Sequence, residues 1–269
     1  MSLLLAALAG VLIGLSLGAL GGGGSILAVP VLVHLLGQSP SQATTGSLVV
    51  VAATSAVAAL SARRTVLLSR GLVFSAVAVG GAVLGARASA WVSENTLMAA
   101  FSVLLLVVGG LMAVRQWRGR RSPTGERPLL DDPIISFSPT FACDCPRAVK
   151  VLVTATAVGL LTGFLGVGGG FLVVPALVLA LQLPMRQATS TSLVVITVTS
   201  LVALGARTGV GAAPDWGLVL LLAVTSAAAA IVGTRLARRI DTRALATTFT
   251  GLVLVVAVLN AQRAVRALT

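Results

Sequence analysis

Ten apolar segments follow one another along the chain, and this succession constrains the fold more than any single motif. Most of them approach the length of about 20 residues that a helix needs to cross a bilayer. Only 10% of the 269 residues are charged, whereas a soluble domain carries about 25%, so the chain has too few charges to cover a water-facing surface. We therefore predict an all-α integral membrane protein whose solvent is lipid.

The segments fall into two sets of five, separated by a polar stretch. The first set covers residues 3–20, 25–36, 42–62, 71–91 and 96–114. The second set covers residues 149–165, 170–183, 187–206, 216–237 and 244–261. We accordingly expect a first membrane repeat at 1–115, a polar linker at 116–147 and a second membrane repeat at 148–269. The segment at 25–36 is short for a span, because twelve helical residues rise only about 18 Å.

Glycine, proline, glutamine and threonine recur in register between the two sets. Six residues of the first repeat have an identical residue 145 positions later. Gly14, Gly18, Gly21, Gly23, Gly24 and Pro30 align with Gly159, Gly163, Gly166, Gly168, Gly169 and Pro175. Residues 42–50 fall without a gap on residues 187–195, and after a shift of three residues Gly85 falls on Gly233. Such matches do not arise easily in low-complexity apolar sequence, so we infer two homologous halves.

The basic residues predict how the halves are oriented. The 19 arginines and lysines give a formal charge of +12, but they lie at segment ends rather than in one patch, which argues against a nucleic-acid partner. If each half crosses the membrane five times, the second half is inverted. The linker side then holds 15 basic residues and the opposite side holds four. Four crossings per half make the repeat parallel and divide them 13 against six. Positive residues prefer the cytoplasmic side, so the count favours ten helices in an inverted repeat over eight in a parallel one.

Two glycine-rich breaks interrupt the apolar segments, at Gly21–Ser25 before Pro30 and at Gly166–Gly170 before Pro175. Each glycine costs about 1 kcal/mol in a helix relative to alanine. A break inside the bilayer frees backbone amides, and the positive end of the half-helix that follows attracts an anion. Paired breaks in two halves therefore indicate the substrate site of a transporter. The alternative is that these glycines allow close helix packing.

A cluster of hydroxyl side chains opens the third segment of each half, close in sequence to each break. Serine and threonine there either cap their own helix or provide donors for an oxyanion. The candidate substrate-binding residues are Gly22, Gly23, Gly24, Ser25, Thr44, Thr45, Ser47, Gly168, Gly169, Gly170, Thr189, Ser190 and Ser192.

Carboxylates are absent from the interior of the predicted segments. Glu94, Asp215 and Asp241 all lie at segment ends, and the pair Cys143 and Cys145 is too small a set for a closed zinc site. We therefore expect neither an enzyme nor a cofactor or metal site. A cation would lack its usual ligands, which favours a small anionic substrate.

The two stretches Gly18–Pro30 and Gly163–Pro175 resemble the TauE/SafE sulfite exporter family, as do residues 42–48 and 187–193 and the later Gly233–Ala237. The resemblance covers the chain apart from the linker. It implies a multi-pass permease of the bacterial inner membrane that moves sulfite, sulfonates or related small sulfur-containing anions. Substrate would be held between the breaks and exchanged by alternating access.

Two other functions fit the same features. An anion channel would use the same basic, carboxylate-poor spans without alternation. A membrane accessory protein without transport activity would use the glycines only for packing. The sequence leaves the oligomeric state open, a homo-oligomer included.

Overall fold

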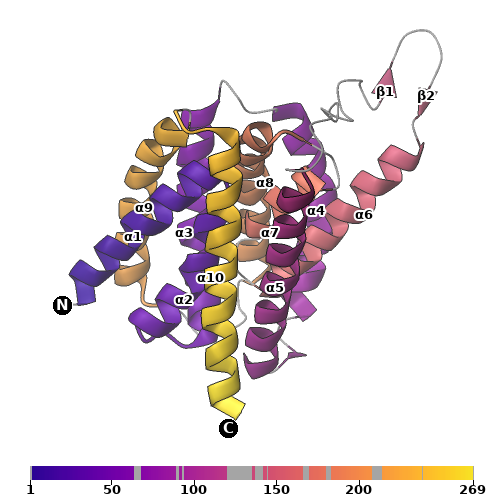
Figure 1. Ribbon diagram of the computed structural model, residues 1–269. Helices are drawn as coiled ribbons and strands as arrows, with labels where there is room; N and C mark the ends of the chain where they lie inside the picture. The colour runs from indigo at the N-terminus through magenta and orange to yellow at the C-terminus, as the bar shows by residue number, and fades with distance from the viewer. Residues whose placement is uncertain are drawn as a thin grey trace.

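The computed structural model is a bundle of helices with both termini toward one end and a short hairpin at the other (Figure 1). It describes residues 2–63, 68–88, 91–92, 94–119, 135–136, 142–143, 145–165, 170–179, 183–207, 214–237 and 239–268.

The helices of the two halves follow the same order along the chain. The first half forms α1 (Ser2–Leu20), α2 (Gly23–Pro30), the π-helix η1 (Val31–Leu35), α3 (Pro40–Ala62), α4 (Leu68–Ala88) and α5 (Glu94–Gly119). The second forms α6 (Cys145–Leu165), α7 (Gly170–Leu179), α8 (Met185–Ala206), α9 (Trp216–Ala237) and α10 (Thr242–Leu268). Between the halves, β1 (Ile135–Ser136) pairs antiparallel with β2 (Ala142–Cys143).

The prediction of an all-helical chain with membrane-length apolar helices is confirmed, apart from the short hairpin. Four described helices are long and apolar enough to cross a membrane, at Ser41–Ala62, Gly71–Ala88, Met185–Ala206 and Trp216–Ala237. Shorter apolar helices cover Leu4–Leu20, Gly23–Val33, Val103–Val114, Val151–Phe164 and Ala244–Ala257. Two helices extend into the stretch predicted as linker, because α5 continues to Gly119 and α6 begins at Cys145.

Local sequence explains where α3 begins and where α2 loosens. Ser39 caps α3 through a capping box, in which the Gln42 amide N–H donates to Ser39 Oγ at 3.3 Å and Ser39 N–H donates to Gln42 Oε1 at 3.2 Å. Pro30 lacks an N–H, and directly after it the helix widens into η1, where Leu36 N–H donates to the Val31 carbonyl at 3.1 Å. Gln42 therefore serves as a helix cap.

The two halves interlock, since the first helix of each packs on the fourth helix of the other (Figure 1). Gly14 and Gly18 of α1 lie against the backbone of Ser226 and Ala230 in α9, so closely that a Cβ would overlap a carbonyl oxygen. The equivalent contacts join α6 to α4, where Gly159 meets Ala78 and Gly163 meets Ala82. Small residues thus allow the close helix approach that stabilises bundles in lipid.

Side-chain contacts give the directions of the helices. Helices α1 and α9 are parallel, because the residue numbers of the contacting residues rise together along both. Helices α3 and α9 are parallel for the same reason, since Gly46 contacts Val219 and Thr54 bonds Ser226 at 2.6 Å. Helices α3 and α8 are antiparallel, because Ser55 bonds Thr197 at 2.9 Å while Thr44 lies beside Arg207.

Helix α4 begins at the same end of the bundle as α8, because Gly71 of α4 lies against Thr191 near the start of α8. Helix α6 runs parallel to α4, since the residue numbers of their contacts rise together. Helices α1, α3 and α9 therefore run one way, and α4, α6 and α8 run the other way.

Two ends of the bundle can now be defined. The basic end holds Arg63 after α3, Arg186 at the start of α8 and Arg239 after α9. The far end holds Ser39, where α3 begins, and Arg207, where α8 finishes.

Candidate functional site

The first glycine break separates α1 from α2 and is held by a hydroxyl from the other half. Gly21 adopts a positive φ of 71°, which an L side chain rarely tolerates, so the chain can turn sharply after α1. Ser192 of α8 donates to the Gly21 carbonyl at 2.8 Å, and Ser25 of α2 donates to the Gly22 carbonyl at 2.7 Å. Both serines are fully buried. The predicted break is therefore present, and Ser192 from the second hydroxyl cluster lies directly against it.

The two half-helices meet at the level of this break. A Cβ on Gly22 would overlap the carbonyl oxygen of Gly170, and a Cβ on Gly170 would lie 2.7 Å from Ser25 Oγ and 3.2 Å from Gly22 Cα. Only glycine allows α2 and α7 to begin this close together. Gly168 and Gly169 of the second break lie outside the described residues.

The other glycines of the first break pack against neighbouring helices. A Cβ on Gly24 would overlap the Ile13 carbonyl oxygen, and one on Gly23 would lie 2.9 Å from Leu252 and 3.0 Å from Leu20. Gly23, Gly24 and Ser25 are all buried. In this conformation the first break is close-packed.

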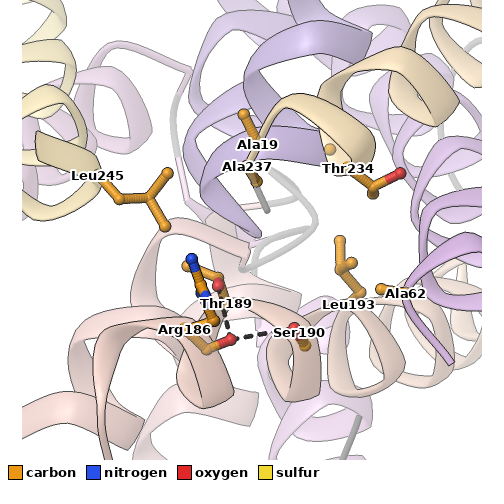
Figure 2. Close-up of a pocket in the computed structure, with 10 residues that line it drawn as sticks. Ala19, Ala62, Arg186, Thr189, Ser190, Leu193, Thr234, Ala237 and Leu245 are labelled. Atoms are coloured by element: carbon orange, nitrogen blue, oxygen red, sulfur yellow. Dashed lines mark hydrogen bonds between the residues drawn. The ribbon is translucent and has the colours of Figure 1, made fainter. Parts of the chain in front are cut away.

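A cavity of about 60 Å³ lies at the basic end, one turn before the break along α1. One water molecule needs about 10–15 Å³ of such space, so the cavity can hold a small anion. Its lining comes from α1, α3, α8, α9 and α10: Gly18, Ala19, Ala62, Arg186, Thr189, Ser190, Leu193, Thr234, Ala237 and Leu245 (Figure 2).

The polar groups of the cavity come mainly from the first turns of α8, which face Thr234 and Ala237 of α9 across the space (Figure 2). Thr189 and Ser190 each donate to the Arg186 carbonyl at 3.0 Å, which fixes their hydroxyl oxygens on α8. The Arg186 guanidinium donates to the Ile240 carbonyl at 3.4 Å and is exposed. Arg186 is the one charged residue among the ten that line the cavity, so the cavity favours an anion.

The hydroxyl cluster of the first half lies at the far end. Thr44 and Thr45 donate to the Ser41 carbonyl at 2.8 and 3.3 Å, and Ser47 donates to the Thr44 carbonyl at 2.9 Å. Because α3 and α8 are antiparallel, these residues lie at the opposite end of the helix pair from Thr189 and Ser190. The structure does not bring the two clusters together.

An arginine that the sequence did not single out contacts the far-end cluster. Arg207, just beyond the end of α8, donates from Nη1 to Thr44 Oγ1 at 3.2 Å and from Nη2 to the Gly163 carbonyl at 3.3 Å. Burial lowers the pKa of the Arg207 guanidinium, because desolvation disfavours its charged form. The sequence shows Arg207 only as one of several arginines at segment ends, and its inward position depends on contacts from α3 and α6.

The cavity uses two of the predicted residues, Thr189 and Ser190, together with others that were missed. Gly18 had appeared only as a repeated glycine, and Ala62 and Thr234 carried no visible signal as lining residues. Arg186 could have been included, since it is the basic residue directly before the second hydroxyl cluster.

Comparison with known proteins identifies a family. The family model described as "Sulfite exporter TauE/SafE" matches residues 6–259. Two curated proteins of Xylella fastidiosa, from strains Temecula1 and 9a5c, are similar to the chain, and each is described as "Probable membrane transporter protein". Each is 33% identical over 190 residues, which cover 70% of this chain and 67% of the relative.

No solved structure matches the chain. The family match nevertheless extends over nearly all of the described helices, and the similar proteins share its transporter description. The chain is a multi-pass membrane transporter, and it belongs to the TauE/SafE sulfite exporter family.

Proposed function

We propose that this protein carries small sulfur-containing anions, sulfite or sulfonates, across the bacterial inner membrane. The observation that carries the proposal is the cavity at the basic end, where Arg186 lies beside the Thr189 and Ser190 hydroxyls. An arginine fork can donate to two oxygens of the pyramidal sulfite ion or of a sulfonate group, and the neighbouring hydroxyls add polar contacts. The family description supplies the substrate class, and the charge of the cavity supports it.

The proposed architecture is an inverted repeat of ten spans, with membrane halves at 1–115 and 148–269 and a cytoplasmic linker at 116–147. Opposite helix directions support it, since α1 and α6, α3 and α8, and α4 and α9 each run in opposing senses. The basic end, which we assign to the cytoplasm, then collects 15 of the 19 basic residues.

The proposed mechanism is alternating access around the level where the two half-helices meet. In this conformation a cavity lies at the basic end, while Arg207 closes over Thr44 at the far end. Between them Gly22 and Gly170 are in contact. Separation of α2 from α7 would expose the amides of Gly22, Gly23, Gly24 and Gly170 to substrate, and the predicted site at the breaks would form only then.

Sulfite flux into proteoliposomes tests the proposal. We expect saturable uptake that is accelerated by sulfite on the opposite side, because a carrier returns faster when loaded. Saturable uptake without this acceleration would indicate an anion channel. If the reconstituted protein moves neither sulfite nor taurine, sulfoacetate or thiosulfate, the proposed substrate class is wrong.

A further inference from the structure

Arg207 occupies the counterpart of the cavity at the basic end. At the repeat offset of 145 residues, Arg207 corresponds to Ala62, Thr44 to Thr189 and Gly163 to Gly18. Ala62, Thr189 and Gly18 all line the cavity. Their three counterparts are in contact, because the Arg207 guanidinium bonds both Thr44 Oγ1 and the Gly163 carbonyl. Where the basic end has the methyl group of Ala62 beside a cavity, the far end has the Arg207 guanidinium bonded to Thr44 and Gly163.

Two arginines lie at the ends of α8, Arg186 in its first turn and Arg207 directly after its last residue. Arg186 provides the positive charge of the cavity at the basic end, and its counterpart at the far end is the neutral Ser41. Arg207 supplies there the charge that Ser41 lacks. Each end of the antiparallel α3–α8 pair therefore has one arginine and one threonine: Arg186 and Thr189 line the same cavity, and the Arg207 guanidinium bonds Thr44 directly.

The groups that Arg207 now contacts through these two bonds are neutral acceptors, a hydroxyl and a backbone carbonyl. The guanidinium already forms charge-assisted bonds to these neutral acceptors, and an anionic oxygen would add the Coulomb attraction between opposite charges. A sulfite or sulfonate group reaching the far end would thus compete well for the same donors. Its oxygens would replace Thr44 Oγ1 and the Gly163 carbonyl.

We infer that Arg207 is the anion-binding residue of a second cavity at the far end, which its own side chain fills in this conformation. The inference rests on the proposed anion transport and adds the residue that meets substrate on the side away from the linker. The guanidinium binds the anion by exchanging its hydrogen bonds to Thr44 and Gly163 for hydrogen bonds to the anion. Closure and binding at the far end therefore depend on the same side chain.

Side-specific kinetics test the inference. The full-length protein is studied in membrane vesicles of both orientations, with sulfite presented either to the far end or to the basic end. Arg207→Gln should raise the half-saturation concentration of sulfite at the far end about 10- to 100-fold, as expected for loss of a charged hydrogen-bond donor. The value at the basic end should change by less than about threefold. Arg186→Gln is the matched control, and it should show the reverse pattern.

Arg207→Lys separates charge from geometry. Lysine keeps the positive charge but loses the planar fork, so it should restore part of the far-end affinity. An unchanged far-end half-saturation concentration in Arg207→Gln, with normal transport by the wild type, would falsify the inference. Absence of flux in the wild type would instead overturn the proposed function.

A labelling measurement that keeps Arg207 provides a second test if Arg207→Gln folds poorly. Ser41→Cys is introduced into protein in which Cys143 and Cys145 are replaced by serine. We expect sulfoacetate at the far end to slow the reaction of this cysteine with a water-soluble thiol reagent; sulfoacetate is used because sulfite itself consumes such reagents. Reaction at an undiminished rate under saturating sulfoacetate overturns the inference.

Discussion

The two ends of the α3–α8 pair are built from corresponding residues and yet differ in state. At the basic end Gly18, Ala62 and Thr189 border a cavity of about 60 Å³, whereas at the far end Gly163, Arg207 and Thr44 are in contact. At the repeat offset, the basic end has Ala62 where the far end has Arg207. We assign the difference in state to this single long side chain.

The largest expected effect comes from making the two ends alike. Ala62→Arg places a second guanidinium in the cavity at the basic end, where it would bond Thr189 as Arg207 bonds Thr44. We expect sulfite uptake to fall at least about 100-fold, equivalent to about 2.7 kcal/mol, because both ends are then filled. Uptake into proteoliposomes measures this.

Ala62→Ser is the control for Ala62→Arg, because it changes polarity with little volume and should retain uptake. The double variant Ala62→Arg with Arg207→Ala exchanges the two ends and should recover part of the activity. Wild-type uptake by Ala62→Arg would show that the cavity is not on the substrate path.

The contact between the two half-helices gives the next effect in size. Gly22→Ala introduces a Cβ that overlaps the Gly170 carbonyl oxygen, so it should destabilise the folded protein by about 1–3 kcal/mol. Thermal unfolding in detergent is the measurement. Gly80→Ala is the matched control, because nothing lies within 4 Å of a Cβ there and alanine favours a helix by about 0.5–1 kcal/mol. Equal effects of both variants would mean that the two half-helices do not touch.

The turns before α3 and α8 differ by one buried amide. The backbone is the same in both turns: the backbone N–H of Gln38 donates to the Leu32 carbonyl at 3.0 Å, and the backbone N–H of its counterpart Leu183 donates to the Leu177 carbonyl at 3.1 Å. Gln38 is only 7% exposed, and its side-chain amide has no hydrogen-bond partner among the described residues. Gln38→Leu should therefore stabilise the protein by about 1–2 kcal/mol, since an unpaired buried polar group costs about 1–3 kcal/mol.

The reverse exchange, Leu183→Gln, tests whether the two turns are equivalent environments. It should destabilise the protein by a similar amount in the same thermal unfolding assay. Loss of stability in Gln38→Leu would show that the amide is bonded to a further group, such as a buried water.

The smallest effects should distinguish the two threonines. Thr189→Val removes a hydroxyl from the cavity while keeping the side-chain shape, so it should raise the half-saturation concentration at the basic end about two- to fivefold. Thr44→Val should instead lower the half-saturation concentration at the far end by a similar factor, because it removes an acceptor that competes with the anion for Arg207. Side-specific uptake measures both. Identical changes on both sides for either variant would argue against two separate binding regions.

The helices and the first break could be read from sequence because their signals are local. Long apolar runs set the helices, and Gly21, with its positive φ, marks the end of α1. The hydroxyl clusters at Thr44 and Thr189 are likewise visible in the sequence, because each lies close to a break; the sequence does not show that they lie at opposite ends of the bundle. Glycine, proline and hydroxyl side chains restrict the backbone wherever they occur, whatever surrounds them.

The sequence gives no sign of the positions of Ala62 and Arg207 in the structure, because these positions depend on residues from other helices. Ala62 matters only because its small side chain leaves a space beside Thr234, and an alanine in an apolar helix gives no signal of this. Arg207 looks like an arginine that reaches for the membrane surface. Its inward position requires Thr44 and Gly163 to converge from two other helices, and no sequence pattern shows that convergence.

The packing of α1 on α9 also has a consequence for how the protein is made. Helix α1 leaves the ribosome roughly 200 residues before its main neighbour α9 has been synthesised. At about 5–20 residues per second, that wait lasts about 10–40 s. During this time Gly14 and Gly18 of α1 face lipid or the insertion machinery instead of α9. Neither half can complete its own assembly first, so biogenesis must keep α1 without its main neighbour until α9 arrives.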